Sequence, residues 1–485
     1  MQISAYSVNP QFYGDNGAPV TPPPASSDSP DRLVSDVTCL GCGCACDDIH
    51  VTVRSGRIVE AARACDLGAA WFGDGSLPAE AAIDTRPATM DAAVAAAAEL
   101  VRASRRPLVY LAPGVTNEAA REAVALADVL GAALDSVTSD TAMAAILAAQ
   151  ERGRASATLG EVRQRADVVV WWGVDPSIRY PRYAERYAPL ARGLHAPDGR
   201  ASRTVIAVDI GDAVAAAEAD RRFLLPGEDE VATLGALRSL VSTPAVEATP
   251  HDGDPVRAAI WARARVLAPA LMSGRYVVVI ADAEPADRAP ERADAHVRLS
   301  ALIALVQALN GPTRAALSLL RAGGNRSGMD AVLTSQTGYP AAVDFSRGAP
   351  RYRPFDGRAS QLAARREVDA AIVIGHLDDV PAAVSAFIAT VPSVVIGPDA
   401  SAMTLGPRSV TIDTGVAGIH DAGTALRLDD VPLPVRAVLP GPPAAPVLLA
   451  ILSSPHSMWR SHGSRSMATL LSSSMSLIAN FITSG

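Results

Sequence analysis

The sequence predicts an α/β fold built on parallel sheets. From about residue 89 onward, short and continuously apolar segments alternate with Ala-rich segments of helical length, which is the pattern of strands covered by helices on both faces. Several apolar segments end in Gly or Asp, where open α/β sheets bind ligands, although such residues more often only form a turn. All five cysteines fall between residues 39 and 65, which predicts a separate small N-terminal domain.

The N-terminal part of the chain divides into a polar segment and a cysteine-rich segment. Residues 1–35 are rich in Pro, Ser, Gly and Asp, a composition typical of disorder. Residues 36–82 are expected to form an Fe–S-type cysteine domain. Within it, apolar pieces at 49–53 and 58–59 flank a turn that contains Gly, which predicts a β-hairpin.

The α/β pattern begins with an Ala-rich helix at residues 91–104, for which Thr89 is the candidate N-cap. A short buried strand at 107–112 and a second helix at 117–130 follow. Further strands are expected at five apolar segments, namely 167–172, 204–209, 276–281, 370–375 and 393–396.

Composition excludes several classes of function. The formal net charge of the 485 residues is −8, so the chain lacks the concentrated basic surface of a nucleic-acid-binding protein. No Lys is present, which excludes a phosphate-binding loop of the Walker type. No apolar run approaches the roughly 18–20 residues that span a bilayer, and no signal peptide is recognised. We therefore expect a cytoplasmic protein with no membrane partner.

The cysteines have the spacing of a metal site. Cys39, Cys42 and Cys46 form a C-x2-C-x3-C run, and Cys65 follows at a distance, while Cys44 is left over. Three thiolates on a tight loop and a fourth further along the chain are typical of a [4Fe–4S] cluster. Four thiolates also suit zinc, and the site could instead have lost its metal, so these two alternatives stay open.

Several motifs in the same order resemble the B subunit of formylmethanofuran dehydrogenase, a family of the molybdopterin oxidoreductase superfamily. The first is the cysteine run at 39–49 together with residues 56–58 and 64–68. Further motifs lie at 158–182, 324–352 and 418–433, so the resemblance covers roughly residues 36–436.

The resemblance implies a domain organisation. After the cysteine domain, one α/β lobe is expected from two pieces of chain, 83–132 and 298–436, with a second lobe inserted at 133–297. The C-terminal β-barrel domain of the superfamily is expected to be absent. Residues 437–485 are expected to be a disordered tail.

The resemblance also implies cofactors, and the sequence departs from the family at one decisive position. The family holds a [4Fe–4S] cluster, here at the four cysteines, and a tungsten or molybdenum bis-pterin guanine dinucleotide whose metal is bound by a Cys or selenocysteine. That position is Thr141, and no Cys occurs after Cys65. A neutral hydroxyl cannot replace a soft thiolate on such a metal, so the metal pterin is not expected, and a cluster at the cysteines would then be vestigial.

Other positions follow from the same motifs. The pterin-side loops of the family place Asn325, Gly338, Asp344 and Arg347 as cofactor-binding residues by resemblance. Tyr180 stands where the family has His. No catalytic residue is assigned to the chain itself.

These departures favour a bacterial relative of the dehydrogenase subunit, the beta subunit of the formyltransferase/hydrolase complex of one-carbon metabolism in methylotrophs. That complex serves formaldehyde oxidation, moving formyl from formyl-tetrahydromethanopterin to a methanofuran-like carrier and releasing formate. The expected partners are the hydrolase, formyltransferase and β-barrel-like subunits, docked on a large apolar surface. Two alternatives remain: an active tungsten or molybdenum dehydrogenase subunit, and an Fe–S protein whose cluster transfers electrons or is structural.

Overall fold

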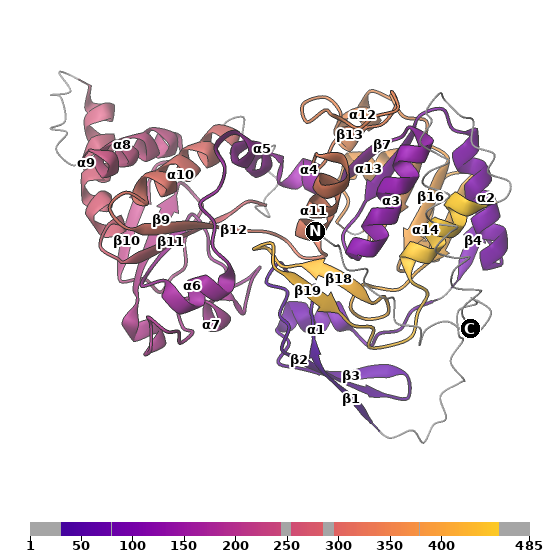
Figure 1. The fold of residues 1–485 in the computed structure, drawn as a ribbon, viewed down its shortest axis with the longest axis horizontal. Helices are drawn as coiled ribbons and strands as arrows, with labels where there is room; N and C mark the ends of the chain where they lie inside the picture. The colour runs from indigo at the N-terminus through magenta and orange to yellow at the C-terminus, as the bar shows by residue number, and fades with distance from the viewer. Residues whose placement is uncertain (1–30, 79, 244–253, 285–294, 378, 455–485) are drawn as a thin grey trace, which may run out of the picture.

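A computed structural model describes residues 31–78, 80–243, 254–284, 295–377 and 379–454. Two α/β lobes stand side by side, and a small antiparallel sheet lies beneath the lobe drawn on the right (Figure 1). The predicted fold class, with two lobes built on parallel sheets, is therefore confirmed. No helix in the described ranges is long and apolar enough to cross a membrane.

The larger lobe contains a nine-stranded sheet whose strand order is β14-β13-β7-β6-β15-β16-β17-β4-β5. The five central strands, from β7 to β17, pair in parallel, and the outer strands pair antiparallel. The strands are β4 (Ala81–Ile83), β5 (Arg86–Pro87), β6 (Pro107–Leu111), β7 (Ala133–Ser136), β13 (Val343–Asp344), β14 (Arg351–Tyr352), β15 (Ala370–Ile374), β16 (Ser393–Gly397) and β17 (Ser409–Asp413).

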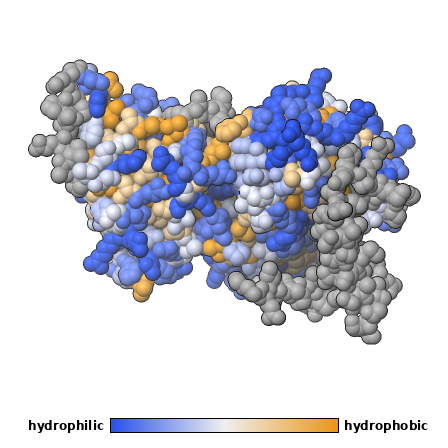
Figure 2. Space-filling view, turned by 45° about the horizontal axis from the view of Figure 1, so that its top comes forward, coloured by the Kyte–Doolittle hydropathy of each residue, from blue (hydrophilic) through white to orange (hydrophobic). Residues whose placement is uncertain are grey.

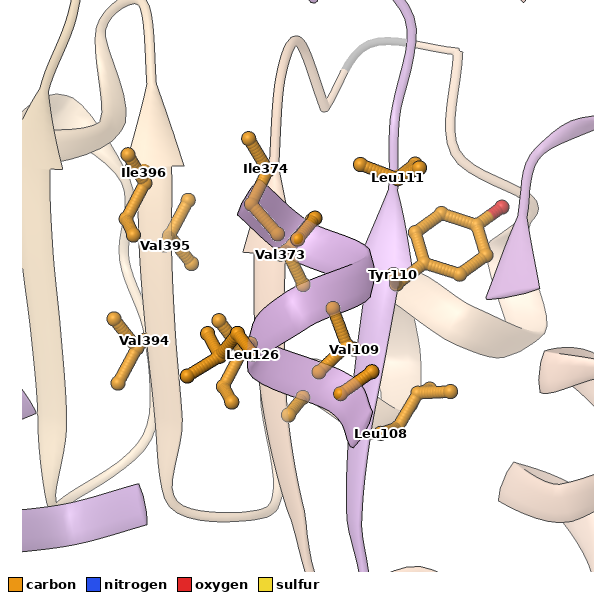
Figure 3. Close-up of a cluster of buried hydrophobic side chains, with 14 of the residues drawn as sticks. Leu108, Val109, Tyr110, Leu111, Leu126, Val373, Ile374, Val394, Val395 and Ile396 are labelled. Carbon is orange, nitrogen blue, oxygen red and sulfur yellow. The ribbon is translucent and has the colours of Figure 1, made fainter. Parts of the chain in front are cut away.

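Helices cover this sheet because its central strands are apolar on both faces. Figure 3 shows buried apolar side chains of β6, β15 and β16 together with Leu126 of α3, which covers one face of these strands. Thr89 caps α2 by accepting a hydrogen bond from the amide of Ala92, as predicted. The helices are α2 (Met90–Ala103), α3 (Asn117–Leu130), α4 (Thr138–Thr141), α11 (Arg326–Thr337), α12 (Ala359–Ala364), α13 (Ala382–Ile388), η4 (Ala400–Ala402) and α14 (Ala444–Ser453).

The second lobe contains a five-stranded parallel sheet of order β10-β9-β8-β11-β12. Its strands are β8 (Val168–Trp172), β9 (Thr204–Ile210), β10 (Arg221–Leu225), β11 (Tyr276–Asp282) and β12 (Arg314–Leu320). Its helices are α5 (Met143–Arg152), α6 (Leu159–Arg165), α7 (Tyr183–Arg186), η2 (Gly199–Ser202), η3 (Gly227–Asp229), α8 (Glu230–Ser242), α9 (Pro255–Leu271) and α10 (Ala295–Leu309).

The two faces of this sheet bury different partners, as the alternation of side chains along a strand requires. Val168, Val170 and Trp172 of β8 pack in the core formed with α8, α9 and α10. Val169 and Trp171 face the other way, into a core shared with α6 and with the cysteines. The second face of the sheet therefore supports the cysteine domain.

The cysteine domain is a three-stranded antiparallel sheet of β1 (Arg32–Val37), β2 (Ile49–Arg54) and β3 (Arg57–Ala62), followed by α1 (Asp66–Phe72). The predicted hairpin is thus confirmed as β2 and β3. A second hairpin, β18 (Gly423–Leu426) with β19 (Pro432–Val435), packs on the cysteine loop through Leu433 and Leu40.

Four predictions about boundaries differ from the structure. Residues 32–37 form β1, which overlaps the segment expected to be disordered, because they pair with β2. Residues 1–30 lie outside the described ranges. Residues 444–453 were expected to belong to a disordered tail but form α14, because their apolar side chains are buried beside α2 and α3. Residues 455–485 lie outside the described ranges.

The other two concern the inserted lobe. The strand β7, at the predicted start of the insertion, belongs to the larger sheet, and β12, beyond its predicted end, belongs to the smaller one. The chain therefore crosses between the lobes later than expected, near residues 142 and 321. Neither strand was predicted from the sequence.

Candidate functional site

The cysteine loop, residues 39–46, connects β1 to β2 and lies against the chain that passes between the lobes. The amide of Cys39 donates to the carbonyl of Cys46 at 2.8 Å and closes the loop. Gly43 comes so near the neighbouring chain that a Cβ there would lie 2.0 Å from the carbonyl oxygen of Arg321. Only glycine permits this approach, which fixes the loop at the point where the chain leaves β12 for α11.

The distant fourth cysteine lies beside the loop. Cys39, Cys44 and Cys46 are buried, whereas Cys42 and Cys65 are partly exposed. A Cβ added at Gly68 would lie 3.2 Å from Sγ of Cys39 and 3.9 Å from Sγ of Cys65, so these two sulfurs are close to one another. The fold therefore brings Cys65 close to Cys39 of the loop.

The surroundings of Cys39, Cys44 and Cys46 favour the neutral form of these three thiols. Burial raises the pKa of Cys39 far above its usual value and raises the pKa of Cys46 to about 11. A hydrogen bond between the thiols of Cys42 and Cys44 lowers the pKa of Cys42 and raises that of Cys44. Since a cluster binds thiolates, loading iron here would release protons.

The donor chemistry fits a [4Fe–4S] cluster, with Cys39, Cys42, Cys46 and Cys65 as the residues that would hold it. Within the part of the chain that the structure describes, no three His, Cys, Asp or Glu side chains are spaced to hold a metal ion. The cluster assignment therefore stays a prediction.

Charged side chains anchor the cysteine loop to the smaller lobe. Both terminal nitrogens of Arg182 donate to the carboxylate of Asp48, at 2.8 and 2.7 Å. Arg186 of α7 pairs with Asp48 and also donates to Asp47 at 2.6 Å. The two aspartates that follow the cysteines in the sequence thus serve to attach the loop.

Thr141, at the position predicted for the metal-binding residue, ends α4 and is engaged by protein groups. Its hydroxyl lies 3.1 Å from the carbonyl oxygen of Val137 and 3.3 Å from a carboxylate oxygen of Glu284. Nη1 of Arg326 lies 3.4 Å from the same hydroxyl and donates to Glu284 at 2.9 Å. A threonine held in this way offers no soft anionic ligand, so the residues present at this position do not fit a metal-bound pterin.

Glu284 is the centre of a buried ionic network. Arg321 donates to it at 2.6 Å and to Asp330 at 2.7 Å, and Arg326 also reaches Asp379 at 3.1 Å. The side chains of Glu284 and Arg326 are only 2% and 4% exposed. Burial opposes ionisation of Glu284, but the charges of Arg321 and Arg326 outweigh it and hold the pKa of this carboxyl below its usual value.

Two clefts, each of about 370 Å³, adjoin this network and share Gly41, Gly323 and Asp379 in their walls. The first extends past Trp71 and His376, whose rings are 5.9 Å apart. The second, which we call the interlobe cleft, is lined by the cysteine loop and by both lobes. Its lining includes Cys42, Thr141, Ile178, Arg179, Tyr180, Glu284 and Arg326.

The four residues predicted to bind a cofactor are not brought together. Asn325 is buried at the start of α11 and is fully engaged with the backbone and with Asn117: its amide group donates to Val115 and Asn117, and its carbonyl accepts from the amide of Leu426 at 2.8 Å. Gly338 ends the same helix, so the helix length of about 18 Å separates the two. Asn325 thus ties α11 to α3 and β18 and has no free group for a ligand.

Asp344 lies near the amino end of the parallel strands of the larger sheet, and Arg347 follows it in the chain. Asp344 pairs with Ala133 at the amino end of β7, whereas Thr141 follows its carboxyl end. Its carboxylate accepts from Arg351 at 2.9 Å and Arg353 at 3.4 Å, and Arg347 is exposed beside it. Asp344 is therefore held by protein groups away from Asn325, and the role of the four residues in cofactor binding stays a prediction.

Glu284, Arg321 and Asp330 were not predicted from the sequence. Glu284 lies just beyond the predicted strand β11, at the carboxyl end where α/β sheets carry functional groups, so that position was a usable signal. Arg321 follows β12, a strand that was not predicted. Asp330 lies within α11 and becomes recognisable only when its pairing with Arg321 is seen.

Comparison with known proteins identifies relatives over most of the chain. No protein-family model matches. The chain is 30% identical over 426 residues to the B subunit of tungsten-containing formylmethanofuran dehydrogenase 2 of Methanocaldococcus jannaschii, covering 85% of this chain and 95% of that protein. It is 28% identical over 424 residues, with the same coverages, to the protein of the same name in Methanococcus maripaludis.

A solved structure shares the fold. A chain in the crystal structure of the formyltransferase/hydrolase complex from Methylorubrum extorquens, in complex with methylofuran, matches with a TM-score of 0.61 and 24% identity. The match covers 76% of this chain and 97% of that one.

Proposed function

Since the chain belongs to the family of formylmethanofuran dehydrogenase B subunits, we propose that it is a non-redox, structural subunit of a formyltransferase/hydrolase complex. The complex would move formyl from formyl-tetrahydromethanopterin to a methanofuran-like carrier and release formate. The transferase and hydrolase steps would take place on other subunits, and this chain would hold them together.

The state of Thr141 carries this proposal. The redox reaction of the family needs a metal with a soft protein ligand, and at this position the chain has a hydroxyl that is hydrogen-bonded to Val137 and Glu284. Two arginines balance the charge of Glu284 within the protein, so this carboxylate is already paired. The likeness in fold to a chain of the formyltransferase/hydrolase complex supports the same assignment.

The surface of the smaller lobe supports a role in assembly. Figure 2 shows apolar surface gathered on this lobe, at the left of the view, whereas the larger lobe is mostly hydrophilic on the same face. The exposed large apolar residues of the smaller lobe are Ile178, Leu190, Leu194, Val214, Leu224, Val256, Val266 and Val297. Hydrolase, formyltransferase and β-barrel-like subunits are the partners we propose for such surfaces.

A second candidate function is an active tungsten dehydrogenase subunit, and the identity to tungsten-containing relatives over 85% of the chain favours it. Such a protein would bind its pterin without a protein ligand to the metal. A third candidate, an Fe–S protein with an electron-transfer or structural cluster, is favoured by the spacing of the cysteines, all five of which are free.

Metal analysis of the purified complex tests all three. The proposal predicts neither tungsten nor molybdenum, no formate-dependent reduction of a viologen dye, and formate release from a formylated carrier. Tungsten or molybdenum in amounts equal to the chain, together with dye reduction, would establish the dehydrogenase instead.

Iron analysis decides the state of the cysteines. Iron and acid-labile sulfide without a heavier metal would show that the cluster alone is retained, and Cys46→Ser should then lower both. The spare residue Cys44 provides the matched control, since Cys44→Ser leaves the four predicted ligands in place.

A further inference from the structure

Each strand of the smaller sheet begins beside an arginine. All five strands run parallel, so their first residues lie along one edge of this sheet, which we call the amino edge. In the order of the strands across the sheet, the arginines at the starts of β10, β9, β8, β11 and β12 are Arg221, Arg203, Arg165, Arg275 and Arg314. The amino edge therefore carries a row of basic residues on a chain whose net charge is −8.

Four of these arginines are available to a partner. They are Arg165, Arg221, Arg275 and Arg314, and all four are exposed. Among the residues that the structure describes, no carboxylate pairs with them and no group accepts a hydrogen bond from their guanidinium groups. Arg203 is the exception, because it is buried and donates to the backbone carbonyls of Ala166 and Pro189 at 2.9 and 2.8 Å. An exposed guanidinium group that lacks a partner can pair with a carboxylate of another molecule.

Three of the exposed arginines lie around Tyr276, the first residue of β11. Arg275 precedes Tyr276 in the chain, and Arg314 is opposite it on the neighbouring strand. Burial raises the pKa of Tyr276, whereas the charges of Arg165 and Arg314 lower it, so both guanidinium groups lie near the ring. The carboxylate of Asp167 accepts from the amides of Arg275 and Tyr276, each at 2.9 Å, and is thus occupied by the backbone. Positive charge therefore dominates this part of the amino edge.

Exposed leucines lie beside the arginines. Leu194 is 75% exposed and Leu190 is 48% exposed. The amide of Leu194 donates to the side chain of Gln164 at 2.8 Å, which places Leu194 against the end of α6, next to Arg165. Arginine is enriched in protein interfaces, and apolar side chains form their centre. The combination is therefore typical of a surface that contacts another protein.

The spread of the arginines favours a protein over a small anion. The strands β10 and β12 are the outermost of the sheet, and four spacings of about 4.8 Å make the amino edge about 19 Å wide. A single carboxylate or phosphate could contact only one or two arginines of such a row. A nucleic acid would require a more continuous basic surface and would leave the leucines in water. A protein surface that carries several carboxylates around an apolar hollow matches both the charges and the leucines.

We propose that the amino edge docks another subunit of the formyltransferase/hydrolase complex, through a surface of that subunit that is acidic around an apolar hollow. Arg165, Arg275 and Arg314 pair with its carboxylates, and Leu194 enters the hollow. The inference rests on the proposed function and adds to it the position of one interface and the chemistry of the partner.

Reversing two charges of the row tests this interface. The chain carrying both Arg275→Glu and Arg314→Glu is tagged and expressed with the other subunits, and the amount of these subunits that co-purifies is measured. It should be about tenfold lower than for the wild type in about 50 mM NaCl, and the difference should shrink in about 500 mM NaCl because salt screens exposed charges. The melting temperature of the variant should stay within about 2 °C of the wild type, since both arginines are exposed and unpaired.

The chain carrying both Arg86→Glu and Arg366→Glu is the matched control. Both arginines are exposed, belong to the larger lobe and have no ion pair among the described residues, and the change of charge is the same. This control should retain the other subunits as the wild type does. Equal retention by the two double variants would overturn the docking site and leave the proposed function standing, whereas a wild type that retains no other subunit would overturn both. Nucleic acid that co-purifies with the wild type and is lost from the first variant would also overturn the proposal.

Discussion

Glu284 is the residue on which the ionic network between the lobes depends. It accepts from Arg321 and Arg326 and touches Thr141, and it is almost fully buried. Removing one partner of such a network leaves an uncompensated charge in a poorly solvated place, which is far more costly than losing an exposed pair. The glutamate is therefore a better target for mutation than Thr141 itself.

Glu284→Gln should lower the free energy of unfolding by about 3–5 kcal/mol, measured by urea denaturation at neutral pH. The depressed pKa of Glu284 means that its ionised form stabilises the fold above the unfolded pKa of about 4.3 and that this contribution is lost as the pH falls. The variant should therefore lose less stability than the wild type on acidification.

Glu185→Gln is the control for this experiment, because Glu185 is 68% exposed and pairs with Arg182 at 3.5 Å. An exposed pair contributes about 0–1 kcal/mol, so this variant should unfold at nearly the wild-type urea concentration. Equal losses in both variants would mean that the buried network does not stabilise the fold.

Asp135 gives a pH dependence of the opposite sign. It lies at the end of β7, fully buried, and burial raises its pKa to about 7. The folded protein thus keeps a proton that the unfolded chain releases near pH 4, so this group lowers stability as the pH rises from about 4 to 7. Urea denaturation at pH 5 and 7 should show a smaller change in Asp135→Asn than in the wild type, and an unchanged difference would contradict the assignment.

The sequence predicted only part of the candidate site. The cysteine set and the substitution at Thr141 could be recognised because each depends on a short motif. The pairing of Glu284 with Arg321 could not be recognised, because the two residues follow different strands and meet only when β11 and β12 lie side by side in the sheet. Asn325 and Asp344 were recognised as motif residues, but their neighbours give them a structural role.

At the level of elements, the sequence predicted those that are long or strongly apolar. The helix α3 has the predicted bounds, and β6, β8, β15 and β16 lie where continuous apolar runs were found. The strands β7 and β12 were not predicted because they contain Asp, Ser or Arg, which interrupt the apolar pattern. Helix α14 was missed because Pro-rich sequence surrounds it, and only its burial beside α2 and α3 shows that it belongs to the core.

Helix α14 allows a test within a single element. Ile451 is fully buried and Leu449 is 42% exposed. Ile451→Ala should lower the free energy of unfolding by about 2–5 kcal/mol, as expected for a truncated core side chain, whereas Leu449→Ala should lower it by less than about 1 kcal/mol. Thermal unfolding followed by circular dichroism measures both. Similar losses at the two positions would argue that α14 does not dock on the lobe.

At the level of the whole molecule, the smaller lobe is the side on which we expect partners to dock. Leu224 lies on the edge strand β10, where it is 67% exposed, and β10 pairs with β9 alone among the described strands. An edge strand with an exposed apolar residue is a natural surface for another chain. Leu224→Glu should reduce the amount of the other subunits that co-purify with a tagged chain.

Phe355→Glu provides the comparison, because Phe355 is 75% exposed but belongs to the larger lobe. It should leave co-purification unchanged. If both variants retain the other subunits fully, the edge of the smaller sheet is not a docking surface.

The position of the ionic network has a consequence for the mechanics of the molecule. The chain crosses between the lobes twice, once after Thr141 and once between Arg321 and Arg326, and all three residues meet at Glu284. Those crossings are where a hinge would lie in a two-lobed protein that opens and closes. Any rotation of one lobe against the other would have to break buried ion pairs. We therefore expect the two lobes to move as one rigid body and to hold the other subunits of the proposed complex at a fixed distance from one another.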